Sequence, residues 1–250
     1  MTTEPRDRSI RFAAVFNFRD VGGLTTAAGQ TVKHRRLFRA DTLSRLADAD
    51  REAYNALGVR TVIDLRRHEE VLSGRAPEWA APTYIHHHID HPYWNRADYR
   101  EELGVVAFLS DRYRELTTHG ARDLAQIVEV IADPESGPVV VHCVAGKDRT
   151  GTVIALTLEL LGVPDEEIAA DYALTERSED AYSRWASVNV PGFAEAPPVP
   201  YYVSTPGEAM LNTLSHLRAE HGTITNYLVN AGLKPQSIES LRAKLLDEPR

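Results

Sequence analysis

The chain has 250 residues, of which 43% are hydrophobic and 26% are charged, a composition typical of a folded globular protein. This length suits one large domain and is short for two, so we expect a single domain over residues 1–250. The 28 basic and 36 acidic side chains give a net charge of −8, which disfavours general binding to nucleic acid or to anionic membranes. Any anion site must therefore come from a local grouping of basic residues.

The N-terminal segment, the most apolar stretch and the cysteine content indicate the cellular compartment of the protein. Residues 1–11 are polar and lack the apolar core of a signal peptide. The most apolar stretch, residues 153–163, contains Glu159 and is too short to cross a bilayer. We expect no membrane insertion and a cytoplasmic location, or export without a cleaved signal. Cys143 is the only cysteine, which excludes an intramolecular disulfide and fits a reducing compartment.

Apolar runs and helical periodicity alternate through the first two thirds of the chain. In chain order they predict a helix at 49–57, strands at 59–65 and 83–89, helices at 105–118 and 121–132, a strand at 138–144, and helices at 152–161 and 165–174. Such alternation predicts an α/β fold with a mostly parallel central sheet and helices on both faces. Ligands of these sheets bind at the carboxyl ends of the strands.

The last third of the chain is predicted to be helical, with helices at 207–221, 223–231 and 235–246. Residues 189–206 contain five prolines, which argues against a regular element there. This segment is either a surface connector or a lid over the active site, with Tyr201 and Tyr202 facing the substrate.

The segment HCVAGKDRTG, residues 142–151, joins the strand at 138–144 to the next helix. The strand places Cys143 at the carboxyl edge of the sheet, and five residues separate it from Arg149. A loop of this length can curl until its backbone N–H groups surround an anion at the helix N-terminus. The residues expected to bind a phosphate are Val144, Ala145, Gly146, Lys147, Asp148, Arg149 and Thr150.

These residue types predict a specific chemistry. A cysteine at a helix N-terminus beside cationic groups favours the thiolate, which can attack phosphorus and form a phosphocysteine. Arg149 offers a planar fork for two phosphate oxygens, and the Thr150 hydroxyl can stabilise the departing thiolate. No cofactor and no metal are needed. The structural alternative is a tight strand–helix connection around an inert buried cysteine.

The loop matches the His-Cys-x5-Arg-Ser/Thr signature of the protein tyrosine phosphatase superfamily and resembles its atypical bacterial branch. Further stretches resemble that branch: NFRDVGG at 17–23, LFRAD at 37–41, VIDLR at 62–66, DYAL at 171–174 and YLVNAGL at 227–233. The resemblance spans nearly the whole chain. It implies that Cys143 is the nucleophile, that Arg149 clamps the phosphate, and that Lys147 and Asp148 are the distinctive pair of the branch.

Members of this branch act on phosphotyrosine, in some cases on phosphoserine or phosphothreonine, and on phosphoinositides. The resemblance therefore implies a phosphorylated protein or a phosphoinositide as substrate. The run Ala145-Gly146-Lys147 also resembles phosphoinositide 3-phosphatases, but those enzymes have a second lysine where this chain has Val144. We rank a protein phosphatase first and a phosphoinositide phosphatase second. A phospho-ligand binding module without turnover ranks below both.

The general acid has three candidates. Asp148, in the loop itself, ranks first, although it can instead position its neighbours Lys147 and Arg149. Asp64 ranks second because it ends a buried strand at the carboxyl edge of the sheet, where it can also pair with a neighbouring arginine. Asp90 ranks third, in a segment that resembles the mobile acid loop of ordinary tyrosine phosphatases.

Other polar residues are predicted to be structural. His142 is expected to bind the loop from behind and to help hold the thiolate, and Arg19 is expected to pair with Asp20. The run at residues 86–88 contains three histidines, but alternate side chains of a strand point to opposite faces, so all three cannot meet one ion. His86 and His88 can still meet one ion together with a distant carboxylate, but the standard spacing of a zinc site is lacking, so we expect no metal.

Overall fold

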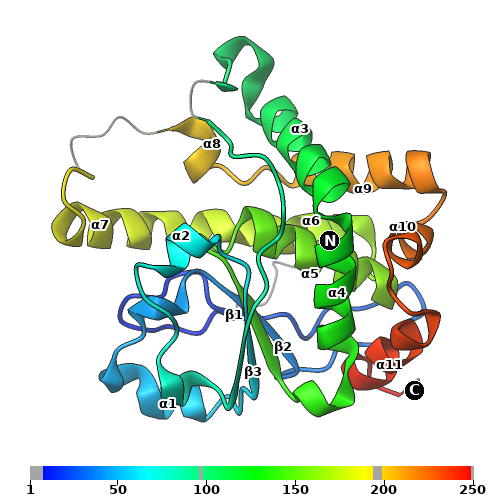
Figure 1. Cartoon of the computed structure of the whole chain (residues 1–250), viewed down its shortest axis with the longest axis horizontal. Helices are drawn as coiled ribbons and strands as arrows, with labels where there is room; N and C mark the ends of the chain where they lie inside the picture. The colour runs from blue at the N-terminus through cyan, green and yellow to red at the C-terminus, as the bar shows by residue number, and fades with distance from the viewer. Residues whose placement is uncertain (1–7, 96–97, 194–198, 249–250) are drawn as a thin grey trace.

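A computed structural model describes residues 8–95, 98–193 and 199–248. A five-stranded sheet crosses its centre in the order β1-β2-β5-β3-β4 (Figure 1). The strands are β1 Arg19–Asp20, β2 Leu37–Ala40, β3 Thr61–Asp64, β4 Thr83–His86 and β5 Val139–His142. β1 is antiparallel to β2, and the other three pairs are parallel. The predicted α/β fold with a mostly parallel sheet is confirmed.

The helices predicted from the sequence are present, most with ends within one or two residues, whereas the helices at 68–71, 179–189 and 200–203 were not predicted. They are α1 Arg51–Asn55, α2 His68–Val71, α3 Gly104–His119, α4 Ala121–Ala132, α5 Asp148–Leu161, α6 Asp165–Ala173, α7 Glu179–Asn189, α8 Pro200–Val203, α9 Gly207–His221, α10 Ile224–Asn230 and α11 Pro235–Leu245. No helix in the described ranges is both long and apolar enough to cross a lipid bilayer.

The two faces of the sheet are buried by different kinds of structure. Val140 and its partner Val62 pack with the N-terminal segment and with Tyr54 of α1. Their strand neighbours Val141 and Ile63 point to the opposite face, where they join the larger core formed with the long helices. Figure 1 shows α4, α10 and α11 on one side of the sheet and α1 on the other.

Two features differ from the sequence-based expectations in ways that matter for the site. α5 begins at Asp148, four residues before the predicted start, so Arg149 and Thr150 lie in its first turn. Part of the 189–206 segment, residues 194–198, lies outside the described residues. In the described part, α8 corrects the expectation that prolines prevent a regular element. Pro200 occupies the first helical position, where a missing N–H costs no hydrogen bond.

Candidate active site

The loop between β5 and α5 lies at the carboxyl edge of the sheet. Its first residue, Cys143, follows the row in which Ala40, His142 and Asp64 pair across three parallel strands. Gly146 lies where a side chain has no room. It has a positive φ of 67°, and a Cβ there would lie 2.3 Å from the carbonyl oxygen of Ala40.

Five successive carbonyl groups, from Cys143 to Lys147, accept hydrogen bonds on the outer side of the loop. The donors are, in order, the His142 ring at 3.1 Å, the Thr42 backbone at 2.9 Å, the Asn17 amide at 2.9 Å, the Arg39 guanidinium at 2.8 Å and the Gly151 backbone at 2.7 Å. In a trans peptide unit the carbonyl and the following N–H point in opposite directions, and the described residues contain no cis bond. The N–H groups of residues 144–148 therefore face inward, toward the space at the N-terminus of α5.

A buried ion cluster lies behind this loop. The Asp171 carboxylate pairs with Arg8 at 2.6 Å, with Arg39 at 2.7 Å and with Arg19 at 3.4 Å. Burial alone would raise the pKa of Asp171, but the charges of Arg19, Arg39 and Arg8 hold it well below its usual range. Burial and the neighbouring Arg39 lower the pKa of Arg19 to about 9. Three guanidinium groups thus face one carboxylate, which leaves an excess of positive charge behind the loop.

The expected ion pair between Arg19 and Asp20 is wrong. Consecutive residues of a strand point to opposite faces, so the two side chains diverge. Arg19 points to Asp171, whereas the Asp20 carboxylate accepts hydrogen bonds from the backbone N–H groups of Gly22 and Arg35.

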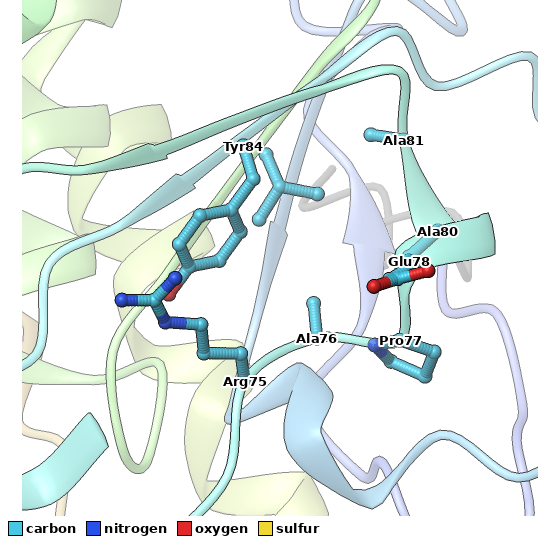
Figure 2. Close-up of a pocket in the computed structure, with 8 residues that line it drawn as sticks. Arg75, Ala76, Pro77, Glu78, Ala80, Ala81 and Tyr84 are labelled. Carbon is cyan, nitrogen blue, oxygen red and sulfur yellow. The ribbon is translucent and has the colours of Figure 1, made fainter. Parts of the chain in front are cut away.

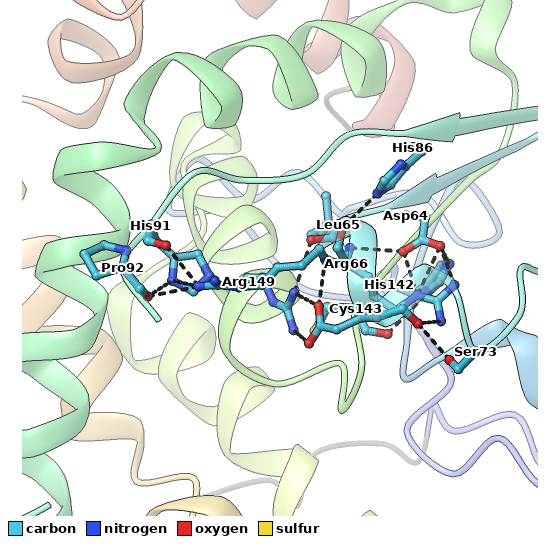
Figure 3. A network of polar contacts seen from close by, with 12 residues as sticks. Asp64, Leu65, Arg66, Ser73, His86, His91, Pro92, His142, Cys143 and Arg149 are labelled. Carbon is cyan, nitrogen blue, oxygen red and sulfur yellow. Dashed lines mark hydrogen bonds and ion pairs between the residues drawn. The ribbon is translucent and has the colours of Figure 1, made fainter. Parts of the chain in front are cut away.

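Arg149 is held from outside the loop by Glu70. Its two terminal nitrogens bind the two carboxylate oxygens of Glu70 at 2.5 and 3.0 Å. Burial would lower the pKa of Arg149, but its interaction with Cys143 and the bonds to Glu70 raise that pKa above its ordinary value. Arg149 is therefore permanently charged, close to the sulfur, and fixed in orientation (Figure 3).

Asp64 lies behind the loop rather than at its opening. Its buried carboxylate binds the Arg66 guanidinium at 2.9 and 2.7 Å and accepts a 2.6 Å hydrogen bond from the Tyr84 hydroxyl. Burial opposes ionisation, but the Arg66 bonds hold the pKa of Asp64 well below its usual range. The Nε2 atom of His142 lies 3.6 Å away, and burial lowers the pKa of that ring to about 4. The neutral ring donates through Nδ1 to the Cys143 carbonyl (Figure 3).

Asp148 has a different environment in the first turn of α5. Its side chain is 27% exposed, its Oδ1 accepts a 2.7 Å hydrogen bond from Tyr113, and Lys147 lies 3.8 Å away. Lys147 itself is buried and donates to the backbone carbonyl of Tyr201 in α8. Burial lowers the pKa of Lys147, while Asp148 acts against this shift. Among the three acid candidates, Asp148 is the one that belongs to the segment expected to bind phosphate and is also partly exposed to solvent.

The remaining loop residues differ in exposure. Val144 is 41% exposed and places an apolar side chain at the surface of the loop. The Thr150 hydroxyl is buried and has no hydrogen-bond partner among the described residues. It is therefore a donor that is available inside the site.

His86, His87 and Asp90 do not form a second group of side chains like the one at the phosphate loop. His86 bonds the Arg66 carbonyl at 2.8 Å, and His87 lies 3.5 Å from Asp123. Asp90 is exposed and its backbone N–H also binds Asp123. Within the described ranges, no group of three His, Cys, Asp or Glu side chains is arranged to hold a metal ion.

A pocket of about 290 Å³ lies beside the edge strand β4, away from the loop (Figure 2). Its lining residues are Val62, Arg75, Ala76, Pro77, Glu78, Ala80, Ala81 and Tyr84. It is linked to the loop through Tyr84, whose hydroxyl donates to Asp64. None of its lining residues belongs to the segment expected to bind phosphate.

A cysteine and an arginine that share such a loop define a cysteine-dependent phosphatase, and comparison with known proteins agrees. The model of the tyrosine phosphatase family matches residues 10–247, so the chain belongs to that family. The resemblance seen in the sequence is thereby confirmed.

Two curated relatives resemble the chain over most of their length. The triple specificity protein phosphatase PtpB of Mycobacterium tuberculosis is 28% identical, over 92% of this chain and 96% of the relative. A tyrosine-protein phosphatase of Nostoc commune is 29% identical, over 83% of this chain and 73% of the relative. Among solved structures, the core catalytic domain of the PP-IP phosphatase SIW14 from S. cerevisiae matches 73% of this chain and 98% of its own, with 16% identity and a TM-score of 0.38.

Four residues with direct contacts to the site were not singled out from the sequence as functional. They are Asn17, Arg39, Glu70 and Tyr113. The first two lie within stretches that resemble the family, which was a usable signal. Tyr113 lies in a segment predicted only as a helix, and no element was predicted at Glu70, so no local signal marked either residue.

Proposed function

We propose that this chain hydrolyses phosphotyrosine, and also phosphoserine and phosphothreonine, through a phosphocysteine intermediate on Cys143. The main support is the loop of residues 143–147, whose carbonyls are bound on the outside and whose N–H groups face inward. With the sulfur at its start and Arg149 at its end, this loop suits a tetrahedral dianion placed against a thiolate.

In the first step, the Cys143 thiolate attacks phosphorus and an S–P bond forms as the P–O bond to the leaving group breaks. Asp148 transfers its proton to the departing oxygen. The inward N–H groups and the Arg149 guanidinium bind the remaining phosphate oxygens and stabilise the charge of the transition state. The bidentate contact with Glu70 fixes Arg149 for this task.

In the second step, a water molecule attacks phosphorus and the S–P bond breaks. Asp148, now ionised, takes the proton of the water, and inorganic phosphate is released. The buried Thr150 hydroxyl, which has no partner in the described part of the chain, is placed to stabilise the sulfur as it leaves. The enzyme then returns to its starting protonation state.

We assign Asp64 a positioning role rather than proton transfer. Its carboxylate is fully buried and already bound by Arg66 and Tyr84, so it has no proton to give. It faces His142, whose ring holds the Cys143 carbonyl on the outer side of the loop. His142 thus supports the first peptide unit of the phosphate loop, while Asp64 orders the side chains of Arg66 and Tyr84.

A phosphoinositide phosphatase is the second candidate, and the run Ala145-Gly146-Lys147 favours it. Two observations rank it lower. Val144 stands where a second lysine is expected, and Lys147 is buried with its ammonium group on the Tyr201 carbonyl. A panel of phosphotyrosine peptide, phosphothreonine peptide and phosphoinositide vesicles separates the two candidates by relative kcat/KM.

The contact between Lys147 and Tyr201 also supports the lid proposal for part of the 189–206 segment. Tyr201 is buried against Phe108 of α3, with ring centroids 4.5 Å apart, whereas Tyr202 is 58% exposed. We therefore propose that α8 covers the Lys147 side of the loop and that Tyr201 anchors it.

The direct test of the function is Cys143→Ser. A serine hydroxyl is not ionised at neutral pH, so hydrolysis of phosphotyrosine peptide should disappear while vanadate still binds to the intact loop. Hydrolysis at a substantial fraction of the parental rate would refute the proposed nucleophile. Loss of vanadate binding as well would mean that the serine variant no longer forms the loop.

A further inference from the structure

Asp148 is tied to two other helices by a short chain of phenols. The Tyr113 hydroxyl, from α3, donates a 2.7 Å hydrogen bond to Oδ1 of Asp148. The same hydroxyl makes a close contact with the hydroxyl of Tyr172 from α6. Both rings are almost fully buried, so this chain is part of the core and not of the surface.

The direction of the chain follows from its proton count. A phenol has one hydrogen to donate, and an ionised carboxylate can only accept. The hydrogen of Tyr113 is committed to Asp148, so the contact with Tyr172 requires Tyr172 to donate to Tyr113. Burial, and next the charge of Asp148, raise the pKa values of both phenols well above the ordinary value. Both tyrosines therefore remain protonated and act as hydrogen-bond donors.

We propose that Tyr113, supported by Tyr172, is the positioning residue of the general acid. Tyr113 occupies Oδ1 of Asp148, which leaves Oδ2 to hold the transferable proton and fixes the rotation of the carboxyl group. This inference rests on the proposed role of Asp148. A carboxyl group held in one orientation delivers its proton to a leaving oxygen more often than one that rotates freely.

The test is Tyr113→Phe, assayed with two aryl phosphates. With phenyl phosphate, whose leaving group is basic, kcat/KM, which reports the first step, should fall about tenfold. With an activated nitroaryl phosphate, which needs little acid assistance in that step, kcat/KM should stay within about twofold of the parent protein. Tyr172→Phe keeps the bond from Tyr113 to Asp148, so the difference between the two substrates should appear again but be smaller. This variant tests the proposal if Tyr113→Phe folds poorly.

Tyr227→Phe is the matched control. Tyr227 is also buried, and its hydroxyl donates a 2.6 Å hydrogen bond to the Thr117 carbonyl of α3. Its loss should lower stability without any dependence on the leaving group. An equal fall with both substrates in Tyr113→Phe overturns the inference.

Asp148→Asn separates this inference from the proposed function. If Asp148→Asn depends on the leaving group and Tyr113→Phe does not, Asp148 is the acid and the positioning role fails. If neither variant shows the dependence, the assignment of Asp148 itself fails. In the double variant, Tyr113→Phe should add nothing to the effect of Asp148→Asn, because both act through one carboxyl group.

Discussion

Glu70 fixes the plane of the Arg149 guanidinium before any phosphate arrives. Two nearly parallel bonds to one carboxylate restrict both the position and the rotation of the arginine fork. These bonds use two of the five guanidinium hydrogens, and a third goes from Nη1 to the Leu65 carbonyl at 3.4 Å, so two remain for phosphate oxygens. The arginine thus enters the reaction already oriented, which saves the entropy of ordering a long side chain.

Glu70→Gln should therefore lower kcat/KM for phosphotyrosine peptide by about tenfold, because a charged, bidentate support becomes a neutral one. Glu69→Gln is the matched control, since Glu69 is the exposed neighbour on the same short helix α2. The measurement is steady-state kinetics of both variants. A Glu70→Gln enzyme as active as Glu69→Gln would mean that Arg149 is positioned by the loop alone.

Asp148 and Asp64, two candidates for the general acid, lie in different environments, so we expect their substitutions to have different effects on the rate. Asp148→Asn should lower kcat/KM, which reports the first step, by about a hundredfold for phenyl phosphate and far less for an activated aryl phosphate, since acid catalysis contributes about 10²–10⁴-fold. Asp64→Asn should lower stability and affect both substrates alike, because Asp64 has no proton to transfer. The ratio of the two rates in each variant decides the assignment. A leaving-group dependence seen only in Asp64→Asn would reverse it.

At the level of elements, the sequence predicted the parts of the site that are continuous in the chain. The strand–loop–helix unit around residues 138–161 follows from an uncharged β-branched strand, a glycine-containing loop and a periodic helix, and the structure contains it. The start of α5 was placed too late because Asp148 and Arg149 interrupt the apolar pattern. Their backbone is helical even though their side chains serve the site.

The sequence alone did not predict the short strand β2 or the side chains that bind the loop from outside. β2 has only four residues and includes a buried arginine, Arg39, which does not fit the alternation of a strand. Its charge is balanced by Asp171, which is 132 positions away along the chain. Asn17 likewise meets Ala145 across 128 positions. Contacts of this range leave no periodic trace in one sequence.

The outward hydrogen bonds of the loop predict that Asn17→Ala weakens anion binding. The Ala145 carbonyl loses its donor, so its peptide unit is free to rotate and withdraw the following N–H from the site. The dissociation constant of vanadate should rise about tenfold, measured by calorimetry.

Thr157→Val provides the comparison for Asn17→Ala. It removes another buried hydrogen bond, from Thr157 to the Val153 carbonyl, within the same helix that follows the loop. It should reduce stability while leaving vanadate affinity unchanged. Equal vanadate affinities in the two variants would show that the Asn17 amide does not shape the loop.

Across the whole molecule, positive charge is concentrated around the phosphate loop, although the chain as a whole is negative. The chain has a net charge of −8, yet Arg149 and the three arginines around Asp171 lie at or behind one loop. Their burial limits screening by solvent and salt, so their effect on a bound dianion persists at physiological ionic strength. We therefore expect a local anion site at this loop in a chain whose overall charge is negative.

Stability should fall between about pH 6.5 and about pH 4 because of the buried His142. The unfolded ring has a pKa of about 6.5, whereas burial lowers the folded value to about 4. Above this range of pH the His142 ring is neutral in both the folded and the unfolded state, so it does not lower the free energy of unfolding. Within this range only the unfolded state takes up a proton, which costs about 3 kcal/mol by pH 4. The lowered pKa values of Asp64 and Asp171 act at still lower pH.

The check is urea unfolding across that range for the parent protein and for His142→Gln. The glutamine cannot titrate, so the variant should show a flatter profile between about pH 6.5 and about pH 4. His91, with a pKa also lowered to about 4 by burial and then by Arg67, contributes to the slope that remains, as does His88, whose pKa burial also lowers. Identical profiles would mean that His142 is not held neutral in the fold.

The most direct test of the account is to trap the covalent intermediate. In Asp148→Asn with an activated aryl phosphate, the first step needs little acid but the second lacks its base, so phosphocysteine should accumulate. Rapid acid quench followed by peptide mass spectrometry should then find one phosphoryl group per chain, on Cys143. Continued turnover with no phosphoryl group on Cys143, or a phosphoryl group on another residue, would contradict the account.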